Sequence, residues 1–203
     1  MSRVFVFGLL AALLPIFTAA SANADLAFVN EIHYDNAGAD TGEFVEFAIE
    51  AGADLTQVVV ELVNGSNGTV YDTLSGSSLT AGTTGVNFGG TLFDLFVWTP
   101  SSIQNGAPDG VAITTSMGLQ EFLSYEGVIS PGRALGTSTD FGVSEVSSTP
   151  IGSSIQLDAT GTFVLTSANT QGLPNFESTV IPEPSSFALL GLFGIAGLVR
   201  RRR

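Results

Sequence analysis

The chain has 203 residues, of which 19 are acidic, six are basic and none is cysteine, and its formal net charge at pH 7 is −13. The absence of cysteine excludes disulfide bonds, thiolate metal sites and cysteine nucleophiles. A strongly acidic chain repels phosphate backbones, so we expect no direct binding to nucleic acid.

Residues 1–24 have the layout of a secretory signal peptide. Arg3 precedes an apolar run from Val4 to Phe17, and Ala22 and Ala24 supply the small residues of a cleavage site. We expect a signal helix here and cleavage by signal peptidase after Ala24. An N-terminal membrane anchor is the alternative, which the short apolar run and its proline disfavour.

Residues 25–181 form the part that we expect to be exported and folded. They contain 18 of the 19 acidic residues but only one basic residue, Arg133, so their formal charge is −17. A chain of this length makes one domain and buries about two-thirds of its unfolded surface. Its charge suits divalent cations or a hydrated matrix better than anionic lipid.

Nine short segments show the alternation or the β-branched runs that are typical of strands. They are residues 26–32, 43–50, 57–63, 69–74, 92–98, 111–115, 119–125, 153–157 and 162–165. We expect Leu26, Phe28 and Ile32 to share one face of the first strand. In the second strand both faces carry bulky residues, so its inward face stays open. No window between the chain ends shows helical periodicity, so we predict an all-β sandwich over residues 25–165.

The connections follow from turn chemistry. Two Asn-Gly steps within residues 64–68 predict a hairpin, because glycine adopts the positive φ angles that hairpin turns require. Residues 75–90 and 126–150 are rich in turn residues and are predicted to be loops. Residues 166–181 are rich in Ser, Thr, Asn, Gly and Pro, and we expect a polar linker there.

The polar stretch after the first strand is a candidate cation site. Asp35, Asn36, Asp40 and Glu43 lie within nine residues. Ca²⁺ requires six to eight converging oxygen ligands, and this loop contains hard oxygen donors and glycine. The spacing is not that of an EF-hand loop, and Asx turns at a solvated edge explain the same residues. We therefore expect no cofactor, with Ca²⁺ as the alternative.

His33 is the single histidine of the chain. A histidine base needs a nucleophile and an orienting carboxylate, and the chain has no Gly-x-Ser-x-Gly elbow. Residues 25–181 also contain neither lysine nor cysteine. We therefore expect no catalytic residues and no enzymatic activity, with His33 in a turn or in the core.

The C-terminal tail is the most informative stretch. Pro182, Glu183 and Pro184 precede an apolar run, for which we predict a transmembrane helix over residues 186–199, and the chain ends in four arginines, Arg200, Arg201, Arg202 and Arg203. The arginines would retain that end on the cytoplasmic side. The tail, residues 182–203, resembles the PEP-CTERM sorting signal of Gram-negative bacteria. The resemblance implies an exosortase as partner, cleavage near Pro-Glu-Pro and transient insertion in the inner membrane.

The domain itself resembles the bacterial lamin-tail domain, an immunoglobulin-like β-sandwich. The segments that carry this resemblance are 29–36, 42–46, 54–55, 64–68, 104–110 and 121–127. Val58 or Val59 stands where that family usually has a tryptophan. The resemblance implies a secreted or surface module without general enzymatic activity.

The two terminal signals and the charge together predict an exported, non-catalytic protein of the cell surface or of an extracellular matrix such as a biofilm. A Ca²⁺-dependent polysaccharide-binding module that uses residues 35–43 is the alternative. Extracellular polysaccharide is therefore an expected partner.

Overall fold

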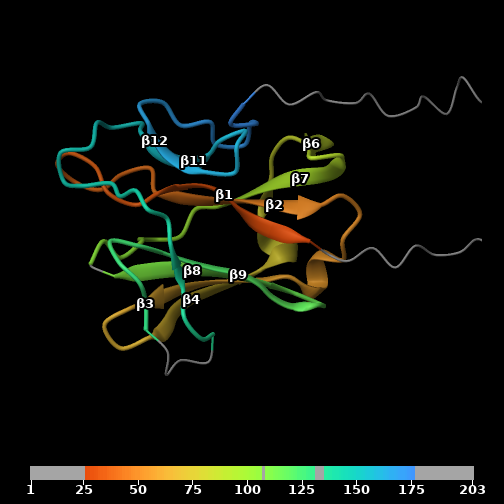
Figure 1. Cartoon of the computed structure of the whole chain (residues 1–203), viewed down its shortest axis with the longest axis horizontal. Helices are drawn as coiled ribbons and strands as arrows, with labels where there is room; N and C mark the ends of the chain where they lie inside the picture. Colours follow the sequence, from red (N-terminus) through yellow and green to blue (C-terminus); the bar gives the residue numbers. More distant parts are fainter. Residues whose placement is uncertain (1–25, 107, 131–134, 177–203) are drawn as a thin grey trace, which may run out of the picture.

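The computed structural model describes residues 26–106, 108–130 and 135–176. In this part of the chain two β-sheets pack face to face (Figure 1). The predicted all-β sandwich is confirmed at this level. The predicted signal helix and the predicted transmembrane helix lie outside the described residues.

The larger sheet has seven strands in the order β12-β11-β1-β2-β7-β5, with β6 also paired to β7. All of its pairings are antiparallel. Its strands are β1 (Ala27–His33), β2 (Phe44–Glu50), β5 (Thr80–Ala81), β6 (Val86–Phe88), β7 (Thr91–Trp98), β11 (Ser154–Leu157) and β12 (Phe163–Thr166).

The smaller sheet has five strands in the order β10-β9-β8-β3-β4. Only the β10–β9 pair is parallel. The strands are β3 (Val59–Asn64), β4 (Thr69–Ser75), β8 (Asp109–Thr115), β9 (Gly118–Tyr125) and β10 (Thr139–Asp140), and two 3₁₀ turns, η1 (Leu55–Gln57) and η2 (Gly76–Ser78), flank β3 and β4.

Each of the nine predicted strands corresponds to an observed strand, with boundaries that differ by at most two residues. The structure adds β5, β6 and β10, which lie in the segments that we predicted to be loops. These strands have two or three residues each, too few to show a periodic pattern. Pairing with β7 or β9 is what makes them strands.

The main core lies between the two sheets. Val45, Phe47 and Ile49 of β2 belong to it, which settles the inward face of that strand. The opposite face of β2 is also buried, because Ala48 packs into a second cluster with Val86, Phe93 and Leu95. The large sheet is therefore covered on both sides at its centre.

A β-bulge in β1 changes the side-chain alternation. The register with β2 shifts between Val29 and Glu31, and such an extra residue reverses which side chains face inward. Ile32 consequently points into the main core, whereas Phe28 packs on the second cluster and Leu26 is 45% exposed. The prediction that these three residues share a face is wrong for this reason.

The predicted hairpin is confirmed, since β3 and β4 pair across residues 64–68. Its two glycines serve different purposes. Gly68 has the expected positive φ of 65°. Gly65 does not have a positive φ, and a Cβ there would lie 1.7 Å from the carbonyl oxygen of Pro108. Close approach of the neighbouring loop requires glycine at this position.

We expect Gly65→Ala to lower the free energy of unfolding by about 2 kcal/mol or more, because backbone must move to admit the methyl group. Gly106→Ala is the matched control, since its nearest neighbour would be an Asp109 carboxylate oxygen at 3.3 Å, which can shift. Urea unfolding followed by the fluorescence of Trp98 measures both. Equal stability of the two variants would contradict the conclusion that the close Pro108 carbonyl requires glycine at position 65.

Candidate functional site

The predicted sorting and cleavage residues lie outside the described residues. They are Ala22, Ala24, Pro182, Glu183, Pro184 and Arg200 to Arg203. Within the described part, no helix has the length and apolar character needed to cross a membrane.

The structure places the four candidate Ca²⁺ ligands around the loop that follows β1, and their side chains are engaged by other groups of the protein. The Asn105 amide donates to Asp40 at 3.2 Å, the Asn36 amide donates to the Thr41 carbonyl at 3.1 Å, and Glu43 accepts the Ile103 N–H at 3.1 Å. Among the described residues, no three His, Asp or Glu side chains are grouped so that they could hold a metal ion.

Asp35 and Asp40 are the closest of these carboxyl groups. Burial, followed by the nearby Asp40 charge, raises the pKa of Asp35. The Asn36 side-chain oxygen is buried and has no hydrogen-bond partner in the described part of the chain. The loop's internal contacts are the hydrogen bonds that Asp40 and the Thr41 carbonyl accept from Asn36.

Glu145 organises the end of β1, and sequence reasoning missed it, because it lies in a segment that we predicted to be a loop. Its carboxylate is fully buried and contacts the His33 ring at 2.8 Å. The same carboxylate accepts the backbone N–H groups of Tyr34 at 2.6 Å and Asp35 at 3.0 Å. The Tyr34 hydroxyl accepts the Glu145 N–H at 2.8 Å. Glu145 therefore fastens the 141–149 segment to β1.

His33 is part of this structural ion pair. Burial acts to lower the pKa of its ring, but the hydrogen bond and the charge of Glu145 outweigh burial, so that the pKa is raised. The other ring nitrogen lies 3.3 Å from the Thr41 carbonyl and 3.0 Å from the Asn36 amide. Both ring nitrogens thus face groups that shape the loop.

Two further buried carboxylates, Glu31 and Glu46, bind the segment that we call the C-terminal strap, residues 167–176. Glu31 accepts hydrogen bonds from the N–H of Thr170 at 2.9 Å and from its hydroxyl at 2.7 Å. Glu46 accepts the Gly172 N–H at 2.5 Å and the Asn30 amide at 2.7 Å. Burial is the main cause that raises the pKa of Glu46 to about 7.

Other contacts complete the attachment of the strap to the outer face of the large sheet (Figure 1). The Asn175 amide donates to the carbonyls of Asn30 at 2.7 Å and Leu157 at 3.0 Å. The Gly172 carbonyl accepts the Thr83 N–H at 2.9 Å. We predicted a polar linker over 166–181; its first part, through residue 176, lies against the sheet, and residues 177–181 lie outside the described residues.

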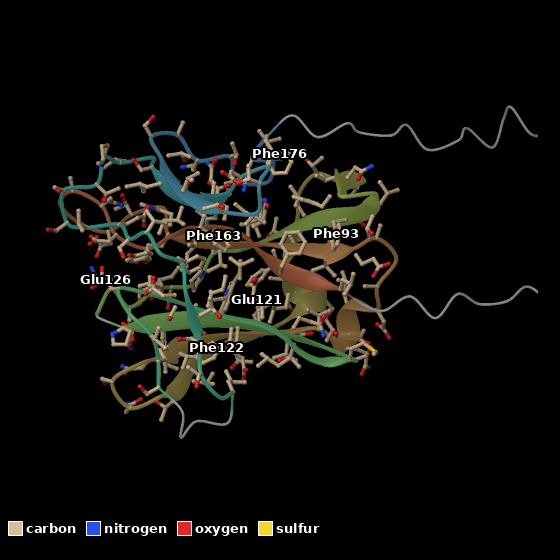
Figure 2. All side chains as sticks on the ribbon, viewed as in Figure 1. Phe93, Glu121, Phe122, Glu126, Phe163 and Phe176 are labelled. Carbon is tan, nitrogen blue, oxygen red and sulfur yellow. The ribbon has the colours of Figure 1, made fainter. Side chains whose placement is uncertain are left out.

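Glu121 lies between the sheets (Figure 2). It comes from β9 and accepts the Val29 N–H of β1 at 2.7 Å. That N–H is available because β11 pairs only with Glu31 and Ile32. Burial raises the pKa of Glu121 to about 7.

Comparison with known proteins identifies the tail. Residues 180–203 match the PEP-CTERM protein-sorting motif, which confirms the predicted sorting signal. No curated protein and no solved structure matches the chain significantly. The motif marks an exported protein that is sorted through an exosortase and is anchored in the membrane in transit.

The raised pKa values predict that the domain loses stability as pH rises from about 5 to 8. At pH values between 4.5, their ordinary pKa, and about 7, their pKa in the fold, Glu46 and Glu121 bind more protons in the folded domain than in the unfolded chain. The free energy of unfolding therefore decreases as the pH rises through this range. His33 adds to the same trend, because stability from a raised histidine pKa is lost as pH rises through it. We expect a decrease on the order of 2 kcal/mol or more, measured by urea unfolding.

Glu121→Gln is the test variant, because its amide oxygen still accepts the Val29 N–H and no charge is buried. We expect it to be more stable than the wild type at pH 8 and nearly equal at pH 5. Glu46→Gln is the contrasting variant: both oxygens of Glu46 accept N–H donors, so an amide is expected to destabilise at both pH values. A wild type that is more stable at pH 8 would refute this account.

Proposed function

We propose that this protein is an exported, non-catalytic component of the cell surface or of an extracellular polysaccharide matrix. The observation that carries the proposal is the sorting motif at residues 180–203, which directly follows a compact acidic β-domain. Signal peptidase would remove residues 1–24, and an exosortase would process the tail.

Several features support a non-catalytic role. The single histidine is bound to Glu145 and to the loop that it shapes, and no nucleophile contacts it among the described residues. The exported region contains no cysteine or lysine. The four candidate Ca²⁺ ligands do not converge, so we do not extend the proposal to Ca²⁺-dependent binding through residues 35–43.

We further propose that the domain is a lamin-tail-like, immunoglobulin-like sandwich. The two packed sheets support this assignment, as do the segments that carry the resemblance, which form parts of β1, β2, β8 and β9 and the β3–β4 turn. In the described chain, Trp98 of β7 is buried in the main core, so a tryptophan contributes to the core from a different strand than that family's usual position.

The intact mass of the protein recovered outside the cell tests the proposed export. We expect an N-terminus at Asp25 and a C-terminus close to Pro184, with the protein enriched in the matrix fraction. The matched variant carries Pro182→Ala, Glu183→Ala and Pro184→Ala, and is expected to keep its C-terminal arginines and to remain with the membrane.

Retention of the full-length chain in the cytoplasm would overturn the proposal. An exported protein that keeps its full tail and stays with the membrane would argue for a plain membrane anchor. Turnover of polysaccharide or nucleic acid that His33→Ala abolishes would contradict the non-catalytic role.

A further inference from the structure

A pocket of about 500 Å³ opens at one side of the large sheet. Four phenylalanines line it, and they come from four separate segments: Phe28 of β1, Phe88 of β6, Phe163 of β12 and Phe176 of the strap. Figure 2 labels Phe163 and Phe176, which mark this region. A volume of this size falls in the range of small-ligand sites.

The rings pack edge to face and leave part of their surfaces open. Phe88 contacts Phe28 and Phe176 at centroid distances of 5.1 and 5.6 Å, with interplanar angles of 88° in both pairs. All four pocket rings are half-buried. The pocket wall is therefore a fixed aromatic surface that remains accessible.

Two polar side chains in the pocket keep unused hydrogen-bonding capacity. The Asn87 side-chain oxygen accepts the Gly90 N–H at 2.8 Å, while its amide nitrogen has no partner among the described residues. One oxygen of Glu121 accepts the Val29 N–H, and the other has no partner in the same described chain. The pocket thus offers a donor and an acceptor beside apolar rings.

Charge restricts what this pocket accepts. The pocket is lined by the carboxyl groups of Glu121 and Asp158, and the described residues contain no lysine or arginine, so the local charge disfavours an anionic ligand. The same residues hold no group of three metal-binding side chains. A purely apolar ligand would leave Asn87 and Glu121 unpaired when it excluded water.

A sugar ring meets each of these conditions. Its C–H groups pack against the negative faces of aromatic rings, and its hydroxyl groups both donate and accept hydrogen bonds. We propose that this pocket binds one unit of an uncharged polysaccharide. The choice of a polysaccharide as the source of the sugar rests on the proposed function, because an exported protein meets extracellular polymers. The raised pKa of Glu121 agrees with a carboxyl group that has no cationic partner.

Saturation-transfer NMR on the protein recovered outside the cell tests this site, with neutral gluco-, manno- and galacto-oligosaccharides of four units as probes. We expect at least one probe to bind with a Kd below about 5 mM. An oligosaccharide of uronic acids is expected not to bind. Phe88→Leu removes one ring of the wall and is expected to weaken binding about five-fold.

Asn87→Asp is the second variant, since it keeps the oxygen that caps Gly90 and removes the free amide. We expect it to weaken binding about five-fold or more. Asn67→Asp is the matched control, because Asn67 caps Thr69 in the same way, at 2.9 Å, in the distant β3–β4 turn. It introduces the same charge and should leave the affinity unchanged.

The proposal is overturned if no neutral probe binds with a Kd below about 5 mM, or if Asn87→Asp and Phe88→Leu both bind as tightly as the wild type. If the protein is correctly exported and associated with the matrix, either result refutes sugar binding in this pocket and leaves the proposed function standing. If the protein is found only in the cytoplasm, and binds the probe after isolation from there, the proposed function is refuted instead.

Discussion

The structure depends on how buried carboxylates are satisfied in a domain that has almost no positive charge. Glu31, Glu46 and Glu145 are fully buried, and the described residues contain no lysine or arginine. A buried carboxylate is costly unless it is paired or hydrogen-bonded. Here His33 supplies one cationic partner, and backbone N–H groups, hydroxyls and amides supply the rest. The polar segments that carry these donors are therefore held in place by their hydrogen bonds to the buried carboxylates.

Each of these contacts joins segments that are far apart in the sequence. Glu145 attaches a long polar segment to the end of β1, and Glu31 links β1 to both β11 and the strap through Ser154 and Thr170. Glu121 connects the two sheets. Because a hydrogen bond requires a donor at a defined distance and angle, these contacts fix segments that have few apolar side chains. The strap lies on the sheet for this reason, although its composition is typical of a linker.

Features that depend on local sequence could be predicted, whereas features that depend on contacts between distant segments could not. Alternating and β-branched side chains identified all nine longer strands, and turn chemistry identified the β3–β4 hairpin, because these signals are local. The bulge in β1 could not be predicted, since its cause is the shifted pairing with β2. Glu145 and the strap were missed because their partners lie more than a hundred residues away. The pocket is absent from the sequence pattern because its four rings come from four segments that meet only in the fold.

The strap also determines where sorting takes place relative to the folded domain. Phe176 is fixed on the domain by Phe88, and Pro182 follows six residues later, a reach of at most about 20 Å. If the exosortase cuts near the Pro-Glu-Pro sequence, as we propose, the cut lies within this reach of the folded domain. Removal of the tail also removes four of the six basic residues. An acidic domain without these arginines is repelled by anionic lipid, so the proposed cleavage would leave a domain that an anionic membrane surface disfavours.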